Sequence, residues 1–67
     1  MDTTLERLKT AKKPLSVTEV ANLLGSHIMT IYGYVSEGKI PHFRVGRRVK
    51  FDGVALARWL ERRWLEV

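Results

Sequence analysis

The chain has no cysteine in its 67 residues, which excludes disulfide bonds and thiolate metal ligands. Its longest apolar runs are only a few residues, far short of the roughly 20 that a membrane-spanning helix needs. The first ten residues also lack the long apolar core of a secretory signal peptide. From these absences we expect a cytoplasmic protein that makes no use of a membrane.

Groups for catalysis are equally scarce. The two histidines, His27 and His42, fall in different predicted elements, and neither a carboxylate pair nor a glycine-rich phosphate loop accompanies them. A chain of 67 residues lies near the lower size limit for a self-standing core, which leaves little room for a buried pocket. The sequence therefore predicts a small protein that is not an enzyme and needs no metal or cofactor.

Positive charge is abundant but unevenly placed. The formal net charge is +5, and residues 26–51 hold five cations against one anion, a net of +4. Residues 1–25 carry a net of +1, and the charges of residues 52–67 cancel. Such a concentration of cations indicates a surface that faces a polyanion; a solvated surface that keeps a small protein in solution is the alternative.

Capping residues and helical periodicity divide the chain. Residues 1–14 are predicted to be an N-terminal segment, either a short helix or a frayed end, and residues 15–67 to be a domain. Ser16 and Glu19 have the spacing of a capping box, and Gly25 supplies a C-terminal stop. The first helix of the domain is expected between these residues.

A second helix is expected from Ser26 or His27 to Glu37, with Gly38 as its stop. At 100° per residue, the buried arc should hold Ile28, Ile31 and Val35. The exposed arc should hold Met29, Thr30, Gly33 and Ser36, with Tyr32 and Tyr34 on its flanks. Two short helices joined by one glycine-containing turn predict a helix-turn-helix.

Residues 40–51, IPHFRVGRRVKF, alternate apolar and cationic side chains and predict a β-hairpin. A two-residue loop would place an apolar side chain opposite a charge, whereas a three-residue loop over residues 46–48 gives one apolar face. That face would consist of Phe43, Val45, Val49 and Phe51. We therefore expect the three-residue loop, although glycine usually stands at the end of such a loop and here stands first.

In this register Arg47 and Arg48 project from the tip, and Arg44 lies opposite Lys50 on the outer face. Like charges directly across a strand pair are destabilising. An anionic partner explains such a pair better than folding does; protection of an edge strand against aggregation is the alternative.

Asp52 is expected to cap a last helix. Its apolar stripe should hold Leu56, Leu60, Trp64 and Val67, with Trp59 beside it. Core packing is the expected role of both tryptophans, with a contact patch of Trp64 and Leu65 as the alternative.

The order helix, turn, helix, "SEGKIP", cationic hairpin, "D" and a helix ending in "RWLERR" resembles the excisionase-like, MerR-related winged helix-turn-helix domains of phage and mobile-element proteins. The resemblance covers about Leu15 to Arg63. "LSVTEVANLLG" is similar to the first helix of the family, "TIY" to the middle of its recognition helix, "EGKIPHFRVGRRVKF" to its wing and "LARWLERR" to its closing helix. The resemblance implies a mainly helical fold with a small two-stranded wing.

Members of this family bind DNA with the second helix in the major groove and the wing along the backbone or minor groove. Excisionases are architectural accessory factors in site-specific recombination: several copies bind cooperatively, bend DNA and assist an integrase without catalysing a reaction. The resemblance therefore implies double-stranded DNA, an integrase or recombinase, and further copies of the chain on DNA as partners.

The expected exposed arc of the second helix carries no lysine or arginine, so the common arginine–guanine contact is absent from it. Members usually have a small hydroxyl residue where this chain has His27, and often arginines at the positions of Ile28 and Gly33. The wing is therefore expected to supply most of the affinity. The expected DNA-contacting residues are His27, Met29, Thr30, Tyr32, Gly33, Arg44, Arg47, Arg48 and Lys50.

Two other functions stay open at this point. A small transcription regulator or a terminase-type DNA-recognition module would use the same elements, but such proteins usually continue into a further domain, and this chain ends at Val67. A protein-interaction module would instead leave the wing solvated and contact its partner through Ile28, Met29, Tyr34, Trp64 and Leu65.

Overall fold

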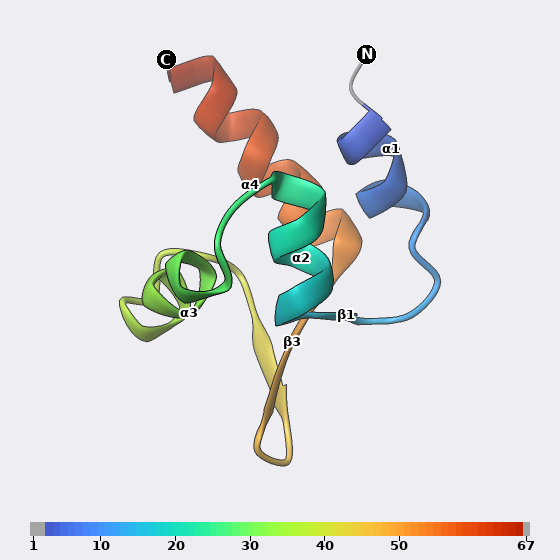
Figure 1. Ribbon diagram of the computed structural model, residues 1–67. Helices are drawn as coiled ribbons and strands as arrows, with labels where there is room; N and C mark the ends of the chain where they lie inside the picture. The colour runs from blue at the N-terminus through green and yellow to red at the C-terminus, as the bar shows by residue number, and fades with distance from the viewer. Residues whose placement is uncertain (1–2, 67) are drawn as a thin grey trace.

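In the residues that the structure describes, four helices and three short strands make up the fold (Figure 1). The computed structural model describes the backbone of residues 3–66 and the side chains of residues 4–63. The elements are α1 (Thr3–Thr10), β1 (Leu15–Ser16), α2 (Val17–Leu24), α3 (Ile28–Ser36), β2 (Phe43–Val45), β3 (Arg48–Phe51) and α4 (Gly53–Glu66). Their order confirms the predicted mainly helical fold, a winged helix-turn-helix with α2 and α3 as the helix pair and β2–β3 as the wing.

The start and the end of α2 follow from its capping residues. The Ser16 hydroxyl accepts a hydrogen bond from the Glu19 N–H at 3.1 Å, and the Glu19 carboxylate accepts one from the Ser16 N–H at 2.9 Å. The predicted capping box is therefore confirmed. Gly25 ends the helix with a φ of +66°, in the left-handed region that glycine enters without steric strain.

The two faces of α3 are as the periodicity predicts. Ile31 and Val35 are buried, whereas Met29 on the opposite side is 67% exposed. His27 is the N-cap, because its Nδ1 accepts a hydrogen bond from the Met29 N–H at 3.1 Å. The helix thus rests on the core by one narrow stripe and leaves its other side to solvent.

The sheet has three strands rather than the predicted two, in the order β1-β3-β2. β1 runs antiparallel to β3, with Leu15 opposite Phe51 and Ser16 opposite Lys50. A strand of two residues is too short to show an alternating pattern, so no periodicity predicted it. The pairing joins the start of α2 to the base of the wing.

The turn of the wing differs from the prediction. Only Gly46 and Arg47 lie between the paired strands, so the predicted three-residue loop is wrong. The observed pairs are Phe43 with Lys50, Arg44 with Val49 and Val45 with Arg48. Gly46 has a φ of +61°, and a two-residue hairpin turn of type II′ needs a positive φ at its first loop position. The glycine at that position was the local signal of the shorter loop.

The predicted apolar face of the wing is wrong for the same reason. Phe43 and Val45 are 39% and 56% exposed, whereas Phe51 at the base of the wing is fully buried. Burial fixes a strand register only where the strand lies against a core. Since the outer part of the wing is exposed to solvent, the register of its two strands is set by the turn.

The cations of the wing are also arranged differently. Residues directly opposite each other in an antiparallel pair point to the same face, so Arg44 shares a face with Val49. The predicted Arg44–Lys50 pair is therefore wrong, because Lys50 lies opposite Phe43. The cations lie on both faces of the wing, and the argument from like-charge repulsion no longer applies.

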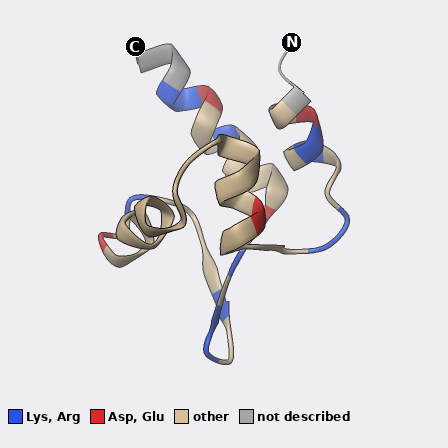
Figure 2. Ribbon diagram, in the orientation of Figure 1, with Lys and Arg blue, Asp and Glu red and all other residues tan. Residues whose placement is uncertain are grey.

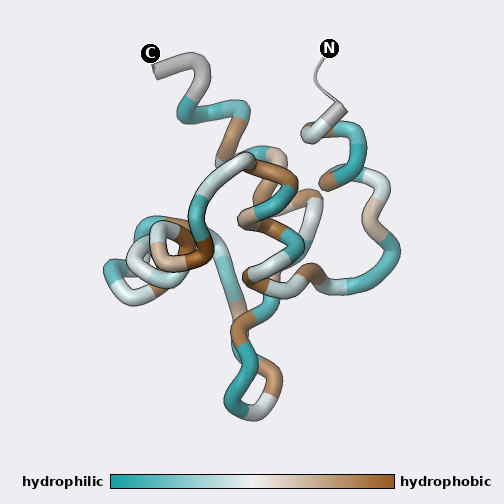
Figure 3. Tube along the Cα trace, viewed as in Figure 1, coloured by the Kyte–Doolittle hydropathy of each residue, from teal (hydrophilic) through white to brown (hydrophobic). Residues whose placement is uncertain are grey.

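The core lies where α1, α2 and α4 meet above the base of the wing (Figure 3). α1 packs against α4, and its Leu5 and Leu8 are buried in the same core as the side chains of the later elements. The division of the chain at residue 14 stays a prediction, but α1 contributes to the stability of the rest. The buried apolar residues are Leu5, Leu8, Leu15, Val17, Val20, Ala21, Ile31, Val35, Ile40, Phe51, Leu56 and Ala57.

α4 begins at its predicted cap, because the Asp52 carboxylate accepts a hydrogen bond from the Ala55 N–H at 3.0 Å. Leu56 is buried, and Leu60 and Trp59 are partly buried. The expected places of Trp64 and Val67 in the apolar stripe, and of Leu65 in a contact patch, lie outside the described side chains. Among the residues that the structure describes, no helix combines the length and the apolar character that crossing a membrane requires.

The contact of α1 with α4 depends on the absence of a side chain at Gly53. A Cβ atom added there would clash with the Leu8 carbonyl oxygen and lie 3.2 Å from the Ala11 Cβ. We therefore expect Gly53→Ala to lower the free energy of unfolding by about 1–3 kcal/mol, the usual cost of overpacking a core. Urea unfolding followed by circular dichroism would measure the change.

Val54→Ala is the matched control, because Val54 is the next residue of the same helix and is 42% exposed. Its effect should stay within about 0.5 kcal/mol, as for most surface substitutions. An unfolding free energy for Gly53→Ala equal to or above that of the unchanged protein would contradict the proposed close contact.

Candidate nucleic-acid interface

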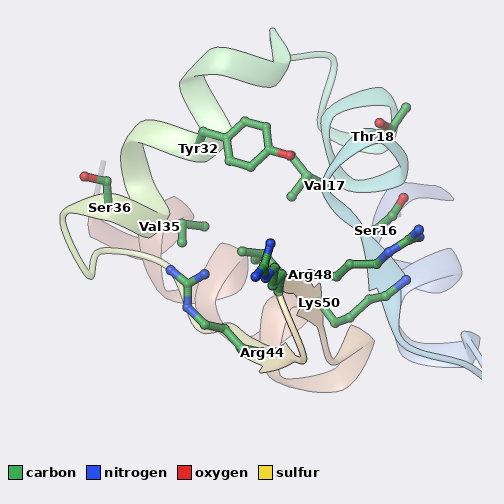
Figure 4. A pocket seen from close by; sticks show the side chains of 11 residues that line it. Ser16, Val17, Thr18, Tyr32, Val35, Ser36, Arg44, Arg48 and Lys50 are labelled. Atoms are coloured by element: carbon green, nitrogen blue, oxygen red, sulfur yellow. The ribbon is translucent and has the colours of Figure 1, made fainter.

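A groove of about 590 Å³ separates the wing from the helix pair. α3 forms one wall, the first residues of α2 form a second, and the two strands of the wing form the third (Figure 4). The lining residues are Ser16, Val17, Thr18, Tyr32, Val35, Ser36, Arg44, Arg47, Arg48, Val49 and Lys50. The groove therefore lies between the helix and the wing that the family resemblance leads us to expect at the DNA.

The groove is strongly cationic. All four expected wing cations, Arg44, Arg47, Arg48 and Lys50, line it, and none of its lining residues is a carboxylate. Figure 2 shows the basic residues along the wing and at its tip, with few acidic residues nearby. A concave surface of one charge raises the local concentration of ligands of the opposite charge. The arrangement can bind a polyanion.

The corrected register places these cations on different sides of the groove. Arg44 points toward the end of α3 that carries Val35 and Ser36 (Figure 4). Arg48 and Lys50 lie on the side of α2 and β1 instead. The wing therefore presents charge in two directions, toward both helices of the pair.

The position of Lys50 is fixed by the sheet. Its Cα lies opposite that of Ser16 in the β1–β3 pairing, and Ser16 is also the N-cap of α2. Glu19 lies close enough to respond to the charge of Lys50. The pKa of Glu19 lies below its usual value, chiefly because its carboxylate accepts the Ser16 backbone hydrogen bond, next through the hydrogen bond with the Ser16 side chain, and to a smaller degree because of the nearby Lys50.

Tyr32 is the one expected α3 contact that lines the groove, and it is 45% exposed. Met29, Thr30 and Gly33 lie on the exposed side of α3 but outside the groove. His27 also lies outside it, at the start of the helix, where its Nδ1 is engaged in capping. The expected residues thus form two groups, one inside the groove and one along the open face of α3.

The structure adds three hydroxyl residues to the groove, Ser16, Thr18 and Ser36. Ser36 belonged to the exposed arc of the predicted second helix and was recognisable on that ground. Ser16 and Thr18 belong to α2, and only the folding of the wing toward the start of α2 brings them to the same groove. Hydroxyl groups are common donors to DNA phosphates.

Among the residues that the structure describes, no three histidine, cysteine, aspartate or glutamate side chains gather closely enough to hold a metal ion.

A comparison with known protein families matches residues 14–63, about three quarters of the chain, to the helix-turn-helix domain family. Searches of curated proteins and of solved structures gave no match. The matched residues include α2, α3, the wing and most of α4, and the family is associated with excisionase-like DNA-binding domains, so the resemblance seen in the sequence is confirmed. Proteins of this family are typically not enzymes. The chain belongs to the helix-turn-helix domain family of DNA-binding proteins.

Proposed function

We propose that the protein is an excisionase-type architectural factor, which binds double-stranded DNA with α3 in the major groove and the wing on the backbone or in the minor groove. The observation that carries the DNA-binding mode is the groove between α3 and the wing, which four cations and no carboxylate line. Duplex DNA offers closely spaced phosphates, and cationic side chains that replace its counterions gain affinity without regard to sequence.

The wing and α3 have separate roles in this mode. The wing cations neutralise phosphates on the two sides of the groove, and the Tyr32 hydroxyl and Thr30 can donate hydrogen bonds to phosphates. Met29, which is 67% exposed, can contact the methyl group of a thymine. Because the His27 Nδ1 accepts the Met29 N–H, its Nε2 carries the proton and can donate to a phosphate.

The exposed face of α3 has little capacity to read bases by hydrogen bonding, since it lacks lysine and arginine. Binding of a single copy should therefore depend weakly on sequence. Several adjacent copies, together with an integrase or recombinase as partner, would supply the selectivity that one copy lacks. Weak base reading by a single copy favours an architectural role over that of a single-site regulator.

The contribution of the wing can be tested by its salt dependence. With about four phosphates neutralised, the logarithm of the association constant should fall with the logarithm of salt concentration with a slope near −3.6. In Arg47→Ala/Arg48→Ala two of these contacts are lost, so the slope should become about −1.8 and affinity should fall for all sequences alike. Fluorescence anisotropy of a labelled duplex over a range of salt concentrations would measure both.

Lys12→Ala/Lys13→Ala is the control, because it removes the same charge from residues outside the groove. Its salt slope should stay near that of the unchanged protein. A slope near zero for the unchanged protein, or no effect of the two arginine substitutions, would show that the wing does not bind DNA.

Gly33 provides a test with effects of opposite sign on stability and binding. Nothing lies within 4 Å of a Cβ atom added at Gly33, so Gly33→Ala should stabilise α3 by about 1 kcal/mol through helix propensity. If α3 lies against a base edge or a sugar at this point, the added methyl group should weaken DNA binding by about tenfold, the result of a clash of about 1.4 kcal/mol. Thermal unfolding and anisotropy would measure the two effects.

Asn22→Ala is a suitable control, since Asn22 is an exposed residue of α2 that lies outside the groove. It should raise helix stability as well but leave DNA affinity unchanged. Unchanged affinity in Gly33→Ala would exclude a close approach of DNA to this part of α3.

The architectural role has its own test, a footprint of the protein on DNA that flanks its gene, including any attachment site. Several protected stretches at regular spacing, appearing together as protein is added, are the expected result. One isolated protected stretch would contradict the excisionase-type role and favour a small regulator, while leaving DNA binding in place.

A further inference from the structure

A second cationic hollow, of about 450 Å³, lies between α4 and the segment that joins α3 to β2. It is lined by Gly38, Lys39, Ile40, Pro41, Ala55, Arg58, Trp59 and Arg62, and it shares no lining residue with the groove at the wing. Arg58 and Arg62 are four residues apart and so lie on the same side of α4. None of the residues that line this hollow is a carboxylate.

Trp59 connects this hollow to a third one. The third hollow has a volume of about 250 Å³ and is lined mainly by apolar side chains, namely Leu23, Leu24, Tyr34, Trp59 and Leu60, together with Thr4, Ser26 and Arg63. Tyr34 meets the Trp59 ring edge to face, with 6.1 Å between the ring centroids. The Arg63 guanidinium lies 4.8 Å from the centroid of the indole. A continuous surface thus has an apolar side and a cationic side.

The indole is held in place within this surface. The Trp59 Nε1 donates a hydrogen bond to the Lys39 carbonyl oxygen at 2.8 Å, which links α4 to the segment before β2. The positive charge of the surface is partly balanced, because Lys39 forms an ion pair with Glu37 at 3.4 Å. The three arginines of α4 at this surface, Arg58, Arg62 and Arg63, form no ion pair among the contacts recorded for the described residues.

The chemistry of the surface distinguishes between three classes of occupant. A DNA backbone would satisfy the arginines but has no apolar group for the side made of Leu23, Leu24 and Tyr34. A second copy of this chain fits poorly, because most carboxylates of the described residues are engaged in its own caps and ion pairs: Glu19, Glu37, Asp52 and Glu61. A peptide with both acidic and apolar side chains satisfies both sides. Tryptophan, tyrosine and arginine are also the residues that dominate protein–protein interfaces.

We propose that this surface of α4 binds an acidic, apolar peptide segment of a protein partner. Leucine-like side chains of the peptide would enter the hollow beside Tyr34 and Trp59, and its carboxylates would meet Arg58 and Arg62. Since the wing groove and this surface share no lining residue, DNA and the peptide can be bound at the same time. The proposal does not depend on which DNA-related process the protein serves.

Three short peptides would test it by ¹H–¹⁵N NMR of the protein: one of glutamate and leucine, one with lysine in place of glutamate, and one with serine in place of leucine. The glutamate–leucine peptide should move the indole N–H signal of Trp59 and the amide signals of Lys39 and Arg58, and leave those of the wing unchanged. Both other peptides should bind more weakly. Arg58→Glu/Arg62→Glu should weaken binding of the first peptide at least about tenfold, since two ion pairs are replaced by repulsion.

The matched control is Lys12→Glu/Lys13→Glu, which changes the net charge equally at residues outside all three hollows. It should leave the affinity for the peptide within about twofold, because distant exposed charges are screened. Each of four results would overturn the proposal: no peptide-induced shift at Trp59, shifts confined to the wing, equal binding of the glutamate–serine peptide, or movement of the Trp59 signal by duplex DNA instead. The last result would assign the surface to DNA.

Discussion

The geometry of the groove between the wing and the helix pair depends on the pairing of two residues of β1 with the end of β3. Leu15 lies opposite Phe51, which is fully buried, and the residue after Leu15 is the N-cap of α2. The residue after Phe51 is Asp52, the cap of α4. A strand of two residues therefore holds the first helix of the helix-turn-helix, the base of the wing and the start of the last helix together. The wing is also joined to the rest of the chain by the segment from α3 to β2 and by the turn from β3 into α4, and β3 packs against α2.

The wing has a buried base at this pairing and a solvent-exposed tip. Phe51 is buried and Val49 is partly buried, whereas Val45 next to the turn is 56% exposed. Cations at a solvated tip cost little in folding, because they keep their hydration and face no buried carboxylate. The base of the wing nevertheless sets the position of these cations, so their charge lies along the groove. This is a suitable arrangement for a ligand whose recognition begins with electrostatic attraction.

The sequence alone predicted correctly those features that depend on residues close together in the chain. The spacing of Ser16 and Glu19 predicted the capping box of α2. Asp52 caps α4 as expected, by accepting a hydrogen bond from the Ala55 N–H. The periodicity of α3 gave its buried and exposed sides correctly, and the family resemblance supplied the order of elements. Local rules succeed here because each of these contacts spans no more than four residues.

Two kinds of feature were missed or wrong: the register of the wing, whose local turn signal was overridden, and features that depend on contacts between distant parts of the chain. The wing register failed because the alternating apolar residues were taken as a buried face, although Phe43 and Val45 have no core to lie against. Gly53 lies against the backbone of Leu8, forty-five residues earlier in the chain, which no local pattern reveals. The cations of the site were visible in the sequence, but Ser16 and Thr18 joined them only through the fold.

The three sides of α4 explain how so small a chain leaves room for a second proposed surface besides the groove at the wing. One side carries Leu56 and Ala57 into the core, and α1 covers a second side, where Lys9 and Glu61 form an ion pair at 3.1 Å. The third side, with Arg58 and Arg62, is left uncovered by any described element. Because the groove at α3 and the wing lies on another face, this third side is not part of the DNA-binding mode proposed above. A protein whose own base reading is limited gains most from a partner that fixes its position on DNA, and the uncovered side of α4 is where the fold leaves room for that contact.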